Sequence, residues 1–211
     1  MLTKQNIHKA YLLISAIVIT AGAFLIMNLG DYFEPRGFLS FTVQSNLLTA
    51  IGFALMVVLY DSEGRLRSYI SFSIIVSISI TGLVYNLLLV PTTPEALPIT
   101  SDFPNFSTHF LSMALALIGY FVFEKKGTFT IKHILASMIF PLTYWIVFVS
   151  IGERIDYFPY FFMEHPVIGW PMTFAWFGII LVVVAILGLL LVSFDKGGVP
   201  SALVRGRRRG E

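Results

Sequence analysis

The sequence predicts an all-α, polytopic membrane protein: a bundle of six transmembrane helices with both termini in the cytoplasm. Three observations support this prediction. Hydrophobic residues make up 56% of the 211-residue chain and charged residues only 12%, whereas soluble domains carry about 25% charged residues. The apolar residues are concentrated in six long stretches, consistent with a mean hydropathy of +0.82. The basic residues lie mostly in alternate gaps between those stretches.

The six apolar stretches have the length that a bilayer requires. A transmembrane helix needs roughly 20 apolar residues to cross about 30 Å of hydrocarbon. The segments between them are rich in Gly, Pro and charge. We therefore expect a single domain, residues 1–211, with a basic cytoplasmic tail at 195–211. The expected helices cover residues 10–29, 38–60, 69–90, 105–123, 132–151 and 170–194.

The distribution of Lys and Arg predicts the orientation. In a six-span protein the N-terminus, the second loop, the fourth loop and the C-terminus share one side, and 12 of the 14 basic residues fall there. Only Arg36 and Arg154 fall on the other side. Because basic segments stay in the cytoplasm, the sequence predicts a multi-pass protein of the cell membrane. A candidate contact for anionic lipid is the group Arg205, Arg207, Arg208 and Arg209.

An alternative interpretation concerns the first stretch. Lys4 and Lys9, an apolar run and then Ala21-Gly22-Ala23 are also typical of a secretory signal with its cleavage site. The apolar run continues to Leu29, which is long for a signal peptide. We therefore expect this segment to be a retained transmembrane helix.

Polar side chains from four expected helices fall at a similar depth near the outer side. In the second helix Thr42, Ser45, Asn46 and Thr49 follow the spacing i, i+3, i+4, i+7 and so share one face. If the four helices turn these faces inward, they form a polar pocket just below the outer headgroups. Beside Thr42 and His109, the candidates to line it are Gln44, Ser45, Asn46, Asn86, Ser112 and Tyr144.

Each polar residue also has a purely structural explanation. The hydroxyl of Thr42 can bond to its own helix backbone. Asn46 and Asn86 can join neighbouring helices, and His109 can hold a structural hydrogen bond or reach water at the interface. The aromatic residues at 157–162 are more typical of an interfacial belt than of a lid. In the inner half, serines are the main polar residues and are expected to permit close helix packing.

Thr42 and His109 together could support nucleophilic catalysis. A threonine hydroxyl is a weak nucleophile that needs a nearby base, and neutral histidine is the usual base at pH 7. This is the only such pair that the expected depths bring together. Asn46, Asn86 or Tyr144 could donate hydrogen bonds to a developing oxyanion. A site at this depth would meet a lipid ester or another amphiphile rather than a sugar.

Other classes of function fit the sequence less well. The absence of cysteine excludes thiol catalysis and thiolate metal sites. The chain has neither an HExxH motif, which zinc proteases carry, nor a Gly-rich phosphate loop. The expected helices carry no Asp, Glu or Lys at mid-membrane, where ion transporters usually do, and no two histidines at one depth to hold a haem. We expect no metal, no cofactor and no nucleic-acid partner.

Four sequence features occur in order along the expected helices: FTVQSNLL at 41–48, His109 opening the fourth helix, PLTYW at 141–145 and YFPYFF at 157–162. They resemble the androgen-induced-gene family of six-span membrane proteins, and more closely its prokaryotic branch of probable six-transmembrane-region proteins. The resemblance covers roughly residues 10–190. Eukaryotic members are intramembrane threonine hydrolases that cleave fatty acid esters of hydroxy fatty acids with one threonine and one histidine.

By position, this resemblance implies that Thr42 is the nucleophile and His109 its partner, with a fatty acyl ester as substrate. The residues after Thr42 differ from the aromatic-rich continuation expected in animal members, which leaves the natural substrate open. Two classes of function therefore remain. One is a lipid ester hydrolase, and the other is a non-catalytic lipid-binding, transport or scaffold protein of the membrane.

Overall fold

The computed structural model describes residues 3–28, 35–61, 64–93 and 96–197, and these residues form helices joined by loops. Six of the helices are long and apolar enough to cross a membrane, as predicted. The six are α1 (Lys4–Ile26), α2 (Phe41–Val58), Arg65–Thr92, Phe103–Phe123, Ile131–Ile155 and α10 (Trp170–Gly197). α10 extends through the first three residues of the predicted tail, 195–197, and the rest of that tail, with Arg205, Arg207, Arg208 and Arg209, lies outside the described residues.

Three of the six spans are interrupted. The third comprises α3 (Arg65–Val84), the π-helical turn η2 (Tyr85–Leu89) and α4 (Val90–Thr92). The fourth comprises α5 (Phe103–Phe106), the π-helical turn η3 (Ser107–Leu111) and α6 (Ser112–Phe123). The fifth comprises α7 (Ile131–Ser137) and α8 (Ile139–Ile155). The shorter elements are η1 (Pro35–Leu39), η4 (Phe161–Met163) and α9 (His165–Ile168).

Pro141 accounts for the interruption between α7 and α8. The helix breaks at Met138, three residues before this proline. Proline has no backbone N–H, so it leaves the carbonyl four residues earlier, that of Ser137, without its helical donor. The fifth span is therefore interrupted before α8, the part that carries Tyr144.

Several helices begin at residues other than those predicted. α1 begins at Lys4 rather than residue 10, because the Thr3 hydroxyl accepts the Asn6 N–H at 3.2 Å and caps the helix. α3 begins at Arg65 rather than residue 69. α2 begins three residues later than predicted, at Phe41, where the Ser40 hydroxyl accepts the Val43 N–H at 3.2 Å. This last cap places Thr42 in the first turn of α2.

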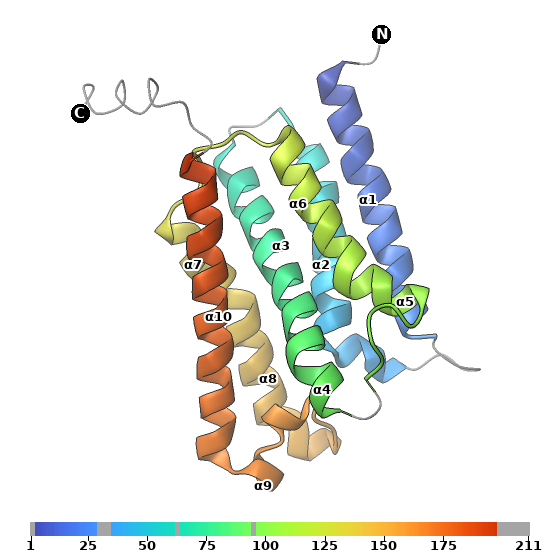
Figure 1. The fold of residues 1–211 in the computed structure, drawn as a ribbon, viewed down its shortest axis with the longest axis vertical. Coiled ribbons are helices and arrows are strands. Elements are labelled where there is room, and N and C mark those ends of the chain that lie inside the picture. Colours follow the sequence, from blue (N-terminus) through green and yellow to red (C-terminus); the bar gives the residue numbers. More distant parts are fainter. Residues whose placement is uncertain (1–2, 29–34, 62–63, 94–95, 198–211) are drawn as a thin grey trace.

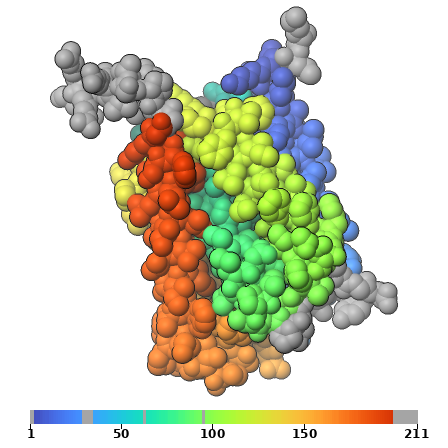
Figure 2. Space-filling view, viewed as in Figure 1, coloured from blue at the N-terminus to red at the C-terminus, as the bar shows by residue number. Residues whose placement is uncertain are grey.

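α3 is the central helix of the bundle. It packs against α2, α6, α7 and α10. In the apolar part of the span to which it belongs, half of the residues are buried, whereas 22% are buried in the apolar part of α10. In Figure 1 the starts of α1 and α3 and the ends of α6 and α10 lie at one end of the bundle, which we call the basic end. In Figure 2 α3 reaches the surface between α10 and α6.

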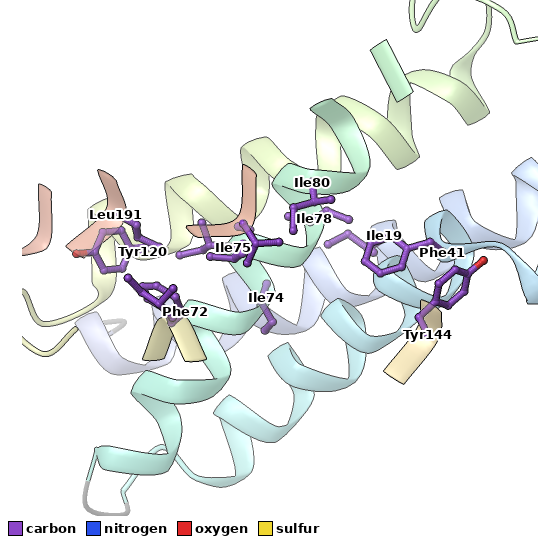
Figure 3. Packing of buried hydrophobic residues seen from close by; sticks show 14 of the residues in the cluster. Ile19, Phe41, Phe72, Ile74, Ile75, Ile78, Ile80, Tyr120, Tyr144 and Leu191 are labelled. Carbon is purple, nitrogen blue, oxygen red and sulfur yellow. The ribbon is translucent and has the colours of Figure 1, made fainter. Parts of the chain in front are cut away.

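The core follows α3 from one end of the bundle to the other. Figure 3 shows Phe72 and Tyr120 near one end of the cluster and Phe41 with Tyr144 near the other. Isoleucines of α3 fill the length between them. On the outside of the bundle, large apolar side chains such as Ile17 and Val58 are exposed. Such an outer surface matches hydrocarbon rather than water.

Candidate active site

Thr42 lies in the first turn of α2, at the end of the bundle opposite the basic end. Its Oγ1 is 3.4 Å from Nε2 of His109, in η3. This is a long hydrogen bond, but the predicted closeness of the two side chains, 67 residues apart in the sequence, is confirmed. Thr42 is half-buried, and His109 is buried.

A π-helical turn presents His109. The Ser112 hydroxyl donates to the carbonyl of Ser107, five residues earlier, at 2.7 Å. α3 crosses this turn closely at Gly82, where a Cβ atom would lie 2.5 Å from the His109 carbonyl oxygen. A larger residue at 82 would therefore push η3 away from α3. Single π-helical turns inside α-helices are often found at functional sites.

The other ring nitrogen of His109 determines what Nε2 can do. Nδ1 lies 3.1 Å from the carbonyl oxygen of Asn105 and 3.2 Å from the Thr108 hydroxyl, which donates to Pro104. A carbonyl oxygen can only accept, so the bond requires the proton on Nδ1. In the neutral ring Nε2 then carries the lone pair and faces Thr42. This tautomer can accept the hydroxyl proton of Thr42.

Tyr85 holds the His109 ring in place. The two rings stack with centroids 3.6 Å apart and planes inclined by 16°. The Tyr85 hydroxyl lies 2.8 Å from Asn105 Oδ1 and 2.7 Å from the Leu97 carbonyl oxygen. The imidazole is thereby fixed on one face by an aromatic ring and at Nδ1 by the backbone.

Thr42 also lines a largely apolar pocket with about 520 Å³ of empty space, counting its open mouth. The pocket lies between α2, α3 with η2, α8 and α10, and none of the described residues that line it is charged. Its lining residues are Phe41, Thr42, Ile80, Thr81, Val84, Tyr85, Leu89, Pro141, Tyr144, Trp145, Tyr160, Phe177 and Ile180. His109 lies behind this wall, in contact with Thr42 and Tyr85.

Of the other predicted pocket residues, Tyr144 lines this space and donates its hydroxyl to the Leu39 carbonyl at 2.7 Å. Asn46 instead joins α2 to η3, donating to the carbonyls of Thr42 at 2.8 Å and Thr108 at 3.1 Å. Its two amide hydrogens are thus both used. Asn46 holds the backbone of the Thr42–His109 pair together rather than facing the pocket.

The remaining candidates bond mainly to nearby backbone. Gln44 donates to the Phe38 carbonyl and Asn86 to that of Gly82. The Ser45 hydroxyl bonds to the Thr42 carbonyl and lies 2.7 Å from the Thr81 hydroxyl of α3. Like Ser112, these three residues do not line the pocket. Thr42 differs from them because it lines the pocket and its hydroxyl lies beside His109 of η3.

Tyr160 lines the pocket although the sequence indicated only an interfacial belt at 157–162. Its hydroxyl oxygen accepts the Phe41 N–H at 3.0 Å and is in hydrogen-bonding contact with Thr42. Burial raises the pKa of the Tyr160 phenol, so the hydroxyl keeps its proton at neutral pH. The YFPYFF segment at 157–162 contributed to the resemblance, but nothing in it distinguishes Tyr160 from its aromatic neighbours. Its neighbours in the pocket come from distant segments.

The basic end carries buried polar groups that the sequence did not reveal. The Arg67 Nη2 donates to Glu124 Oε1 at 2.7 Å, and buried His8 lies 3.5 Å from the same oxygen. Asp195, at 0% exposure, accepts the Tyr120 hydroxyl at 2.5 Å and the Phe129 N–H at 2.7 Å. These bonds tie the ends of α1, α3, α6 and α10 to one another.

A second hydroxyl–histidine pair also lies toward the basic end. Ser68 Oγ is 3.0 Å from Nε2 of His133. Nδ1 of His133 accepts the backbone N–H of Thr130 at 3.1 Å and so caps the start of α7. The ring also stacks on Tyr69, with centroids 4.0 Å apart.

No group of three or more His, Cys, Asp or Glu side chains that could hold a metal ion occurs in the described residues. No protein-family model, no curated protein and no solved structure matches this chain.

Proposed function

We propose that this chain is an intramembrane hydrolase of lipid esters, with Thr42 as the nucleophile and His109 as the general base. The observation that carries the proposal is the position of the Thr42 hydroxyl. It lies between the unprotonated Nε2 of His109 and a largely apolar pocket that opens to the surface. Nucleophilic catalysis requires this arrangement: a hydroxyl, a base oriented by a further group, and room for the substrate.

In the proposed reaction, Thr42 Oγ1 attacks the ester carbonyl carbon while its proton passes to His109 Nε2. The C–O bond to the alcohol then breaks, and the leaving oxygen takes that proton from the imidazolium. A water molecule, deprotonated by the same histidine, attacks the acyl carbon of the acyl-threonine. The bond from that carbon to Thr42 Oγ1 breaks, Oγ1 takes the proton back from the imidazolium, and the fatty acid is released. The Asn105 carbonyl supports the base throughout, because it accepts from Nδ1 in both the neutral and the charged ring.

The pocket favours a neutral ester between apolar chains. Its lining offers aromatic and aliphatic walls and no charged side chain among the described residues, so a buried ionic headgroup would lack a partner. Fatty acid esters of hydroxy fatty acids, the substrates implied by the family resemblance, fit if their free carboxylate stays outside the pocket. We therefore propose membership of that family and a fatty acyl ester as substrate.

The proposed setting is the cell membrane, with the basic end in the cytoplasm and the pocket near the outer leaflet. Its support is the concentration of Lys and Arg on one side of the sequence-predicted spans. Since the chain has no cysteine, single-cysteine variants can be made without first replacing native cysteines. In intact cells, an impermeant thiol reagent should label Thr93→Cys and spare Thr128→Cys. Labelling of Thr128→Cys from outside would contradict this orientation.

The hydrolase proposal is tested with purified protein in detergent, using a long-chain acyl ester and a fluorophosphonate probe. Thr42→Ala should abolish both turnover and labelling. Thr49→Ala is a matched control on the same helix, since the Thr49 hydroxyl donates to its own helix at the Ser45 carbonyl, and it should retain both. Full turnover by monodisperse Thr42→Ala would refute the mechanism. Absence of both signals in folded wild-type protein would favour a non-catalytic lipid-binding, transport or scaffold role.

A further inference from the structure

We propose that Tyr160 is a third catalytic residue, whose hydroxyl donates a hydrogen bond to the substrate's acyl oxygen as negative charge develops there. The inference rests on the proposed hydrolysis at Thr42. It assigns the stabilising role that acyl transfer needs to a residue outside the predicted transmembrane helices.

The Tyr160 hydroxyl lies beside the nucleophile. Its oxygen is 3.0 Å from the backbone nitrogen of Phe41, the residue before Thr42, and it is in hydrogen-bonding contact with Thr42 itself. Thr42 and Tyr160 both line the pocket. A carbonyl carbon attacked by Thr42 Oγ1 therefore has its oxygen within reach of the Tyr160 O–H group.

The other hydroxyls of the pocket donate their hydrogens to the protein. Tyr144 donates to the Leu39 carbonyl at 2.7 Å, and Tyr85 to Leu97 or Asn105. Thr81 can donate to Ser77 in its own helix at 3.0 Å. In the described part of the chain, Tyr160 instead receives the Phe41 N–H, and the other partners of its hydroxyl are two side-chain hydroxyls, those of Thr42 and Tyr144. Its O–H group can therefore turn to a substrate oxygen.

The start of α2 makes this O–H group a stronger donor. Phe41 and Thr42 occupy the first turn, where backbone N–H groups lack helical partners and the helix dipole is positive. A hydroxyl whose oxygen accepts an N–H bond is polarised and donates more strongly. The raised pKa of the buried phenol keeps its proton in place at neutral pH. Thr42's proton still goes to His109, and Tyr160 lends a hydrogen bond without giving up its own proton.

Tyr160→Phe removes only the hydroxyl, and Tyr144→Phe is the matched comparison in the same pocket. For Tyr160→Phe we expect kcat to fall about 100-fold, the usual loss for one oxyanion donor, with KM little changed. Tyr144→Phe should lose much less of kcat, because its hydrogen already bonds to Leu39. Equal losses in the two variants would overturn the assignment.

A pair of ligands separates a catalytic role from a structural one. A long-chain trifluoromethyl ketone can add to Thr42 and form an oxyanion, whereas the corresponding ether cannot. Tyr160→Phe should weaken the ketone about 100-fold and leave ether affinity unchanged. Parallel loss of both ligands would mean that Tyr160 only shapes the pocket. If wild-type protein neither hydrolyses the ester nor binds the ketone more tightly than the ether, the hydrolase proposal itself fails, and this inference with it.

Should Tyr160→Phe not be monodisperse, 3-fluorotyrosine at position 160 keeps the shape and the hydroxyl while lowering the phenol pKa. The more acidic O–H group should bind the ketone more tightly, and activity should decline at a lower alkaline pH than in wild-type protein. An unchanged ketone affinity together with an unchanged pH profile would overturn the assignment.

Discussion

Two hydroxyl–histidine pairs in this protein look alike and differ in what they can do. Ser68 and His133, toward the basic end, are 3.0 Å apart, closer than the 3.4 Å between Thr42 and His109. By distance alone, the serine pair would be the better candidate for catalysis. The hydrogen-bond partner of Nδ1 in each histidine leads to the opposite conclusion.

His133 accepts the Thr130 N–H at Nδ1, so in the neutral ring its proton must be on Nε2. That nitrogen then donates to Ser68, whose own hydrogen goes to the Arg65 carbonyl at 2.7 Å. His109 bonds to a carbonyl at Nδ1 and presents a lone pair to Thr42 instead. The first histidine caps a helix, and the second is prepared to act as a base.

The largest expected effect comes from removing each hydroxyl. Thr42→Ala should lower ester hydrolysis by at least about 1,000-fold, as loss of a nucleophile does in other hydrolases, while Ser68→Ala should keep near-normal turnover. Initial rates on purified, monodisperse protein measure both. Loss of activity in Ser68→Ala with Thr42→Ala unaffected would reverse the assignment of the two pairs.

The histidine variants should show a similar division. His109→Ala should lose activity to the same degree as Thr42→Ala, and the double variant should be scarcely worse, because residues that act as a unit are strongly non-additive. His133→Ala should mainly reduce thermal stability, since it removes the cap of α7 and the stack on Tyr69. Additive losses in the double variant would show that Thr42 and His109 act separately.

A smaller effect is expected from the hydroxyl beside His109 Nδ1. Thr108→Val keeps the shape of the side chain and removes a partner 3.2 Å from that nitrogen. The loss of a hydrogen bond of about 1 kcal/mol should reduce kcat about fivefold. Thr130→Val, next to His133, is the control and should lower stability with activity retained. No change in kcat for Thr108→Val would leave the Asn105 carbonyl as the sole support of the tautomer.

The last comparison requires no substitution. Nitrogen NMR on protein labelled at histidine should show the proton of His109 on Nδ1 and that of His133 on Nε2. The signals are assigned with the His109→Ala and His133→Ala variants. Detection of the Nε2-protonated form at His109 would remove the basis for its role as general base in the resting protein.

The sequence predicted the Thr42–His109 pair better than the buried groups of the basic end. Thr42 and His109 stood out because polar side chains are rare in apolar helices, and counting residues from the outer boundary placed them at one depth. His8 and Arg67 were hidden because α1 and α3 begin earlier than hydropathy indicated. Asp195 was predicted to be the first residue of the cytoplasmic tail, whereas the structure buries it against Tyr120 and Phe129.

The sequence by itself determined the number of spans, because six apolar stretches separated by polar breaks satisfy the bilayer in only one simple way. It also singled out Thr42 and His109. Only the tertiary structure decided which nitrogen of each histidine carries the proton, which of the candidate side chains face the pocket, and that Tyr160 joins them. Hydropathy reports the solvent around a helix, whereas a tautomer or a free hydroxyl depends on single atoms from distant segments meeting within about 3 Å.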